Sequence, residues 1–136
     1  MPSPFSYNGD MSDKASPPSP VSVRFPSALD RWVRQQASLE RRSVAEMVRI
    51  LTEEARVTRL FPQIVFRDGP SGRRAAFLDG PDVWQVLEPY VLSGGDTGIL
   101  RVSWPHLPPW KLETALRYYE VFPEEIDARI ARNSAE

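Results

Sequence analysis

The stretch VSVRFPSALDRWVRQQASLERRSVAEMVRILTEEAR, residues 21–56, carries the strongest structural pattern in the chain. Its first six residues alternate between apolar and polar side chains, which is the two-residue period of a half-buried strand. The apolar side consists of Val21, Val23 and Phe25, and the other side of Ser22 and Arg24. Pro26 ends this predicted strand.

Two amphipathic helices are expected after the strand. In the first, Ser27 is the predicted N-cap and Asp30 stands at the reciprocal position, and in the second Ser43 and Glu46 form an S-x-x-E capping box. The residues expected to face inward are Leu29, Trp32, Val33 and Ala37 in the first helix, and Val44, Met47, Val48, Leu51 and Ala55 in the second. Trp32 is therefore interpreted as a core residue and not as part of a ligand site.

One strand and two short helices cannot fold alone, because the strand leaves its backbone unpaired and about forty residues bury too small a core. A dimer solves both problems if residues 21–26 of two chains pair as an antiparallel ribbon. Ser22 and Arg24 would then stand on the outer face of the ribbon. Such a ribbon fits the major groove of DNA, where arginine can donate two hydrogen bonds to guanine.

Residues 21–56 resemble the ribbon-helix-helix family of bacterial repressors and antitoxins. The resemblance implies that Ser22 and Arg24 contact bases. It also implies that the N-terminus of the second helix, at Ser43 with Arg42 nearby, holds a phosphate. Free amides and the helix dipole favour an anion there. The plainer alternative is that Arg24 is a solvated strand residue and Ser43 only a cap.

The second half of the chain predicts a hairpin followed by helices. IVFRDGPSGRRAAFL, residues 64–78, is apolar on both sides of a turn cluster, which indicates a β-hairpin. Helices are expected at residues 82–92, with Asp82 as cap and Pro89 as a kink or early end, near Trp110 with Pro109 suited to the first helical position, and from Pro123 onward. Gly98 weakens a further segment, TGILRVSW. The inward residues are Val83, Val86, Leu87 and Val91, then Leu112, Ala115, Leu116 and Tyr119, then Ile126 and Ile130.

Residues 64–133 are similar to the small helical domain of VapB-type antitoxins, which usually accompanies a PIN-like ribonuclease toxin. The motifs that carry this similarity are GRRAA, GPDVW and the tail L-x-YY-x-x-x-P-E-E-I-D. The resemblance implies a helix-turn-helix-like cluster made by TGILRVSW and the helix after Pro109. The chain departs from the family pattern at Pro108, where a Thr or Ser cap is common, and at Pro89 and Gly98, which argues against DNA reading by this half.

Charge separates the two halves. Residues 21–59 hold eight arginines and five acids, a net charge of +3, whereas residues 60–136 hold eight bases and eleven acids, a net charge of −3. The first half can meet phosphate, and the second is better suited to a protein partner. Its partner-binding candidates are Arg73, Arg74 and Tyr118. The two arginines either enter an acidic site of the partner or form a solvated strand edge; Tyr118 is expected to be exposed and Tyr119 to face the core.

The composition argues against an enzyme. The chain has no cysteine and a single histidine, His106, and it has no nucleophile elbow, Gly-rich phosphate loop or H-E-x-x-H motif. We therefore predict no catalytic residue, metal site or cofactor, and interpret WPHLPPW, residues 104–110, as a rigid corner. Residues 1–20 are Pro- and Ser-rich and predict a disordered tail. Without an export signal or a membrane-spanning run, the protein is expected in the cytoplasm.

These observations predict a mainly α protein with small β elements: a ribbon-helix-helix dimer over residues 21–59, and a hairpin with a helical domain over residues 60–136. The leading functional hypothesis is a type II antitoxin that represses its own operon by binding operator DNA as a homodimer and neutralises a PIN-like toxin. The alternatives are a free-standing ribbon-helix-helix transcription regulator without a toxin partner and an adaptor in which the ribbon only dimerises.

Overall fold

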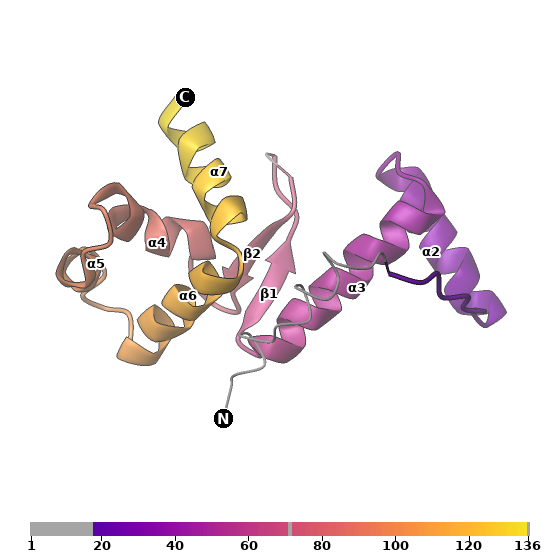
Figure 1. The fold of residues 1–136 in the computed structure, drawn as a ribbon, viewed down its shortest axis with the longest axis horizontal. Coiled ribbons are helices and arrows are strands. Elements are labelled where there is room, and N and C mark those ends of the chain that lie inside the picture. Colours follow the sequence, from indigo (N-terminus) through magenta and orange to yellow (C-terminus); the bar gives the residue numbers. More distant parts are fainter. Residues whose placement is uncertain (1–17, 71, 136) are drawn as a thin grey trace. The chain divides into compact units, whose positions relative to one another are not determined.

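The computed structural model describes residues 18–70 and 72–135. Within these residues the chain is mainly helical, with six helices and one two-stranded antiparallel hairpin (Figure 1). The chain forms two compact units that divide between Ile50 and Leu51, and each unit is described by itself. The predicted tail lies outside the described residues except for residues 18–20, which form neither helix nor strand.

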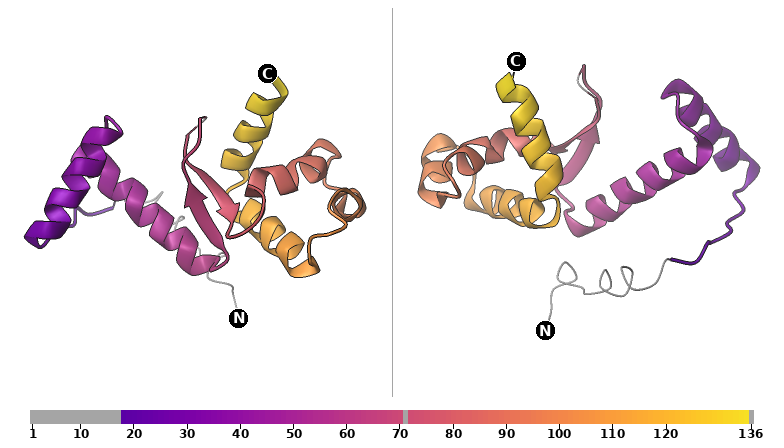
Figure 2. Two further views of the ribbon diagram at one scale, coloured as in Figure 1. Left: turned by 180° about the vertical axis from the view of Figure 1, so that it is seen from behind. Right: turned by 45° about the horizontal axis from the view of Figure 1, so that its top comes forward.

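The first unit contains helix α2 (Ser27–Leu39) and the first half of helix α3 (Val44–Leu60). Residues 21–26 precede α2 and pair with no other strand among the described residues (Figure 2). The strand predicted there is thus absent from the single chain. Its expected pairing with a second chain remains a prediction.

Helix α2 begins one residue earlier than its predicted cap implies. Pro26 occupies the N-cap position with φ −55° and ψ 153°, and its carbonyl accepts a hydrogen bond from the Asp30 amide at 2.9 Å. Ser27, the predicted N-cap, is already helical, so that prediction was wrong. The Asp30 carboxylate accepts a hydrogen bond from Arg34 Nε at 3.0 Å, which leaves it as half of an exposed ion pair.

The apolar face of the first unit is only partly covered. Val33, Ala37 and Met47 are buried as predicted. Leu29 and Trp32, which were expected in the core, are 43% and 45% exposed in the single chain. The first unit therefore carries large apolar side chains that its own described residues do not cover.

The two units share helix α3, whose 17 residues run to Leu60. The domain boundary predicted at residues 59–60 falls at the end of this helix, since residue 60 is its last residue. In the second half of the helix the predicted inward residue Ala55 is exposed, while Val57 is buried. The buried face of α3 therefore includes Val57 and not Ala55 in its second half. Val57 is one turn before Phe61, whose side chain is buried and whose amide donates a hydrogen bond to the Val57 carbonyl at 2.8 Å.

The second unit opens with the predicted β-hairpin. Strand β1 (Ile64–Arg67) pairs antiparallel with β2 (Arg74–Phe77), and Ile64 lies opposite Phe77. The Arg67 guanidinium donates to the carbonyls of Phe77 and Leu78 at 2.7 Å and to that of Gly80 at 3.1 Å. Arg67 thereby fastens the turn that leaves β2.

Four helices complete the second unit: α4 (Val83–Leu92), α5 (Thr97–Ser103), α6 (Pro109–Val121) and α7 (Pro123–Ala135). Helix α4 is central, because it contacts β2, α5, α6 and α7 (Figure 1). The fully buried side chains around it include Phe61, Phe77, Val83, Val86, Leu87, Leu100 and Tyr118. The predicted core residues Leu112, Ala115, Ile126 and Ile130 are buried as well.

Two residues that should weaken helices do not prevent them. Pro89 lies inside α4, which nevertheless continues to Leu92. Segment 97–103 forms α5 despite Gly98, because the Asp96 carboxylate accepts hydrogen bonds from the amides of Gly98 at 2.8 Å and Ile99 at 3.2 Å. This cap satisfies amides that the first turn would otherwise leave without a partner.

Asp82 joins the hairpin to the start of α4. It is the N-cap residue of that helix, its backbone forms a bridge with Ala76 of β2, and its amide donates to Gln85 Oε1 at 3.0 Å. Its carboxylate pairs with Arg74 Nε and accepts a hydrogen bond from Trp84 Nε1 at 3.2 Å. The side chain of Asp82 is only 10% exposed, so these partners replace most of its water.

Replacing Asp82 with alanine should therefore destabilise the second unit. Removal of one partner leaves Arg74 part-buried and unpaired, and we expect a loss of about 2–4 kcal/mol, since solvent at Arg74 screens part of the effect. The measurement is urea unfolding followed by far-UV circular dichroism. The matched control is Asp79→Ala, because Asp79 is 84% exposed and pairs with Lys111 at 3.2 Å. Equal losses in the two variants would contradict this role of Asp82.

Candidate functional site

The predicted DNA-contacting residues all lie in the first unit. Ser22 and Arg24 are exposed on the segment before α2, and Arg42 and Ser43 are exposed in the turn between α2 and α3. The described residues of a single chain do not bring the two pairs into contact by any hydrogen bond or ion pair. All four residues are exposed to solvent, and Arg42 and Ser43 also make contacts at the start of α3.

The turn between α2 and α3 has a defined backbone geometry. The amide of Arg42 donates to the Ala37 carbonyl at 2.9 Å and that of Arg41 to the Ser38 carbonyl at 3.2 Å, which is the hydrogen-bond pattern of a Schellman motif. Arg41 has φ 55°, the left-handed position that glycine usually fills. An arginine there costs about 1 kcal/mol relative to glycine. The turn nevertheless places Arg41 and Arg42 directly before α3.

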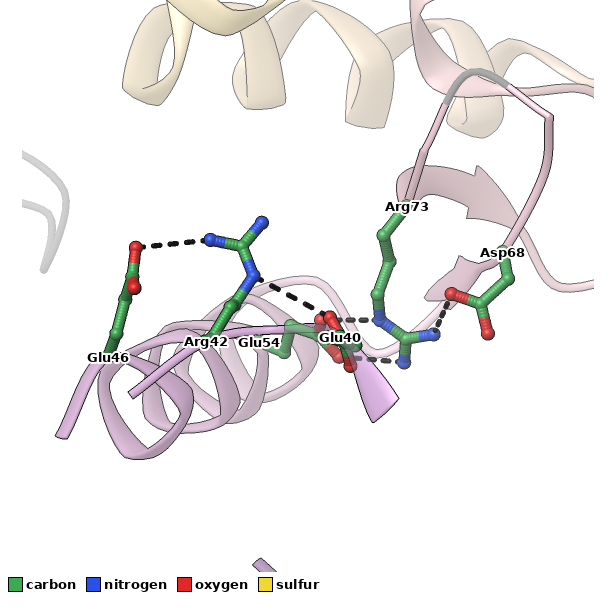
Figure 3. A network of polar contacts seen from close by, with 6 residues as sticks. All are labelled: Glu40, Arg42, Glu46, Glu54, Asp68 and Arg73. Atoms are coloured by element: carbon green, nitrogen blue, oxygen red, sulfur yellow. Dashed lines mark hydrogen bonds and ion pairs between the residues drawn. The ribbon is translucent and has the colours of Figure 1, made fainter. Parts of the chain in front are cut away.

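Ser43 caps α3 as predicted. Its Oγ accepts a hydrogen bond from the Glu46 amide at 3.1 Å, while the Glu46 carboxylate accepts from Arg42 Nη1 at 3.2 Å. Arg42 Nε also lies 3.7 Å from Glu40 (Figure 3). The amides of Val44 and Ala45 have no acceptor within the helix, so the start of α3 combines free donors, a hydroxyl and two arginines.

Sequence reasoning missed Arg41. The only signal is that Glu-Arg-Arg-Ser links two strong helix patterns without a glycine, while helices commonly end with a residue in the left-handed conformation. Nothing in a helix pattern indicates which residue of the link does so. The structure assigns that position to Arg41.

The two hairpin arginines of the second unit are both held by acids of this chain. Arg73 donates to Glu54 at 2.5 and 2.9 Å and to Asp68 at 3.1 Å (Figure 3). The hydrogen bond to Glu54 is the main reason why the pKa of Arg73 is raised. Arg74 pairs with Asp82. Both arginines are thus ion-paired within the chain, Arg73 at an exposed position and Arg74 at a half-buried one. Binding of a partner by this pair stays a prediction.

The expected orientation of the two adjacent tyrosines was wrong. Tyr118, expected to be exposed, is fully buried, whereas Tyr119 is partly exposed and donates to Asp127 Oδ1 at 2.8 Å. The Tyr118 hydroxyl lies 3.1 and 3.0 Å from the two carboxylate oxygens of Glu125. Burial raises the pKa of both Tyr118 and Glu125. The core selects Tyr118 because its ring packs between Phe61 and Phe122, at centroid distances of 5.5 and 4.9 Å.

His106 lies exposed in the turn between α5 and α6. The nearby indole of Trp104 donates to the Val86 carbonyl at 3.0 Å, and Pro109 is the first residue of α6, as predicted. Residues 104–108 therefore connect two helices and attach the connection to α4. Among residues 18–70 and 72–135, no group of three His, Cys, Asp or Glu side chains could hold a metal ion.

No described helix is long and apolar enough to cross a membrane. In comparisons with protein-family models, with curated proteins and with solved structures, the chain has no significant match.

Proposed function

We propose that this protein is the antitoxin of a type II toxin–antitoxin pair, which represses its own operon as a DNA-binding dimer and neutralises a PIN-like ribonuclease. The proposal takes its functional content from the two family resemblances of the sequence. The observation that supports it best is the uncovered apolar side of the first unit.

That apolar side fits a second copy of the same chain. Val21 and Val23 are 83% and 66% exposed on a segment that has no strand partner among the described residues, and Leu29 and Trp32 are exposed on the adjoining helix. Antiparallel pairing of residues 21–26 from two chains would satisfy their backbone groups and bury Val21 and Val23 in a shared core. The exposure of Trp32 in the single chain is then a consequence of the missing partner.

The polar groups of the first unit suit a nucleic acid. Pairing through Val23 leaves Arg24 on the outer face of the ribbon, where two copies can read guanines in the major groove. The N-terminus of α3, with Arg41, Arg42 and Ser43, offers donors and positive charge to a backbone phosphate. A net charge of +3 for residues 21–59 supports the same assignment.

The second unit is better suited to a protein partner. Residues 60–136 have a net charge of −3, which disfavours phosphate. Four large apolar side chains are exposed from the end of α4 to the start of α6: Leu92, Ile99, Val102 and Trp110. Val102 is 80% exposed, so burial of this set against a toxin would remove substantial apolar surface from water.

The dimer is tested by the change Val23→Glu. A buried unpaired carboxylate in the ribbon core should convert the dimer to monomer at micromolar concentration in sedimentation velocity. The control Ser22→Glu places the same charge on the outer face and should remain dimeric. If both variants still form dimers, the two chains do not associate through the ribbon, and that part of the proposal is wrong.

DNA contact is tested by the change Arg24→Ala. On a duplex from the promoter region upstream of the gene, a gel-shift titration should show at least tenfold weaker binding, because one bidentate contact to guanine contributes about 1–3 kcal/mol. Arg34→Ala removes an equal charge from the Asp30 ion pair on α2 and should leave affinity within about twofold. Unchanged affinity of the Arg24 variant would contradict base reading by this residue.

The antitoxin role is tested by co-expression with the neighbouring reading frame. Expression of that neighbour alone should stop growth, and co-expression with the wild-type chain or the Arg24→Ala variant should restore it, with both proteins recovered in one complex. The change Val102→Glu should weaken both rescue and recovery, whereas Ser103→Glu, at the next position of α5, should not. If expression of the neighbouring reading frame does not stop growth and the chain binds DNA sequence-specifically, the protein is better explained as a transcription regulator without a toxin partner.

A further inference from the structure

A groove lies in the second unit between helices α5 and α6. Both helices pack on α4 rather than on each other, and residues 104–108 connect them (Figure 1). The groove has a volume of about 350 Å³. Ligand sites usually have ~300–1,000 Å³. The groove is therefore large enough to receive more than one side chain of a partner.

The groove is lined by one face of each helix. From α5 and its C-cap these residues include Leu100 and, one turn later, Trp104, and from α6 they include Leu112 and, one turn later, Leu116. Leu100 and Leu112 are buried, whereas Trp104 and Leu116 are half-buried. The floor of the groove is thus apolar, and part of it is open to solvent.

The end of the groove beside the link between the two helices is held in place. The Trp104 indole donates to the Val86 carbonyl of α4 at 3.0 Å, which fixes the position of its ring. Pro105 and Pro109 also line the groove, and their rings restrict the backbone there. Such fixed groups lose little conformational freedom when a partner binds, which favours affinity.

Opposite charges stand on the two sides of the groove. Arg101 lines it from α5 and Glu113 from α6, and both residues are exposed. Neither side chain forms a hydrogen bond or an ion pair with any residue that the structure describes. An apolar centre with a polar, accessible rim is the usual arrangement of a protein interface. Both charges are therefore available to whatever occupies the groove.

The apolar lining favours an occupant whose backbone is already hydrogen-bonded. The groove is walled by helices, which use most of their own backbone groups internally, so an extended segment would leave N–H and C=O groups unpaired there. An α-helix pairs its backbone internally and presents apolar side chains three and four residues apart on one face. The Glu113 carboxylate and the apolar floor disfavour the phosphates of a nucleic acid.

We propose that this groove binds an amphipathic helix of a partner protein, with its apolar stripe on the floor, an acidic side chain opposite Arg101 and a basic side chain opposite Glu113. Turning such a helix end for end exchanges its two flanks, so the two rim charges fix the direction in which it lies. None of the four exposed apolar residues assigned above to the toxin surface lines the groove. The site is therefore a separate one and does not depend on the proposed function.

The test uses the full-length chain and three stapled helical peptides that share one leucine stripe. The mixed peptide carries glutamate along one flank and lysine along the other, the acidic peptide carries glutamate along both flanks, and the basic peptide carries lysine along both. A staple on the outer face gives the three peptides the same helicity. Affinity is measured by fluorescence anisotropy of the labelled peptides at about 0.15 M salt, where distant charges are screened.

The wild-type chain should bind the mixed peptide about threefold more tightly than either of the others, because each of those places one like charge against the rim. Arg101→Glu makes both sides of the groove acidic, so the basic peptide should become the tightest ligand. Glu113→Arg makes both sides basic, so the acidic peptide should become the tightest. The double variant Arg101→Glu with Glu113→Arg restores opposite charges and should again prefer the mixed peptide.

The control Arg132→Glu makes the same change of charge at an exposed position of α7, outside the groove, and should keep the wild-type order of the three peptides. Far-UV circular dichroism and urea unfolding check that each variant is folded. Folding should be retained, because Arg101 and Glu113 are exposed and make no polar contact with the described residues.

Three results would overturn the proposal. The first is a mixed peptide that shows no saturable binding below about 1 mM, which is weaker than about −4 kcal/mol. The second is the same order of affinities in the wild type and in both single variants, because the peptides would then bind elsewhere. The third is self-association of the chain that Arg101→Glu abolishes and the mixed peptide does not displace, which would assign the groove to a second copy.

Discussion

The contacts of Asp82 connect the hairpin of the second unit to its central helix, α4. One residue caps α4, bridges to β2, pairs with Arg74 and orients Trp84. The Asp82 carboxylate is only 10% exposed, and the free energy lost on removing it from water is larger than the stabilisation that any one of these contacts provides. Several partners together are therefore needed to stabilise it. The hairpin and the central helix are therefore fixed to each other by a polar contact, and the apolar core packs around that arrangement.

The two units expose different kinds of surface. The first carries uncovered Val21, Val23 and Trp32 beside a turn rich in arginine, and these are the residues that the proposed pairing with a second copy would cover. The second buries a core of its own and holds its hairpin arginines in internal ion pairs, while its large exposed apolar side chains lie between the end of α4 and the start of α6. Two different roles, dimeric DNA binding and protein binding, are consistent with this contrast.

Local sequence patterns predicted the helices and strands well where a capping residue or a regular spacing of apolar residues marks them. Ser43 caps α3, Asp82 stands at the N-cap of α4, and Pro109 begins α6, because each residue type suits that position whatever surrounds the helix. Prediction failed where contacts with other parts of the fold decide which side chain is buried. The stripe of α6 was assigned to Tyr119, but the ring of Phe61, which lies far away in the sequence, packs against Tyr118 at a centroid distance of 5.5 Å. Phe122, the C-cap residue of α6 one turn after Tyr118, packs against the same ring at 4.9 Å.

The residues of the candidate sites also form two groups: those whose positions the sequence predicts, and those that only the tertiary structure brings together. The sequence by itself determined the helices, the hairpin, the separation of charge between the halves and the exposed positions of Ser22, Arg24, Arg42 and Ser43, since these follow from local period, turn residues and composition. Only the tertiary structure decided that Arg73 and Arg74 are held by Glu54, Asp68 and Asp82, and that α5 and α6 line one groove. Ion pairs and pockets depend on distances between residues far apart in the chain, and no local pattern encodes those distances.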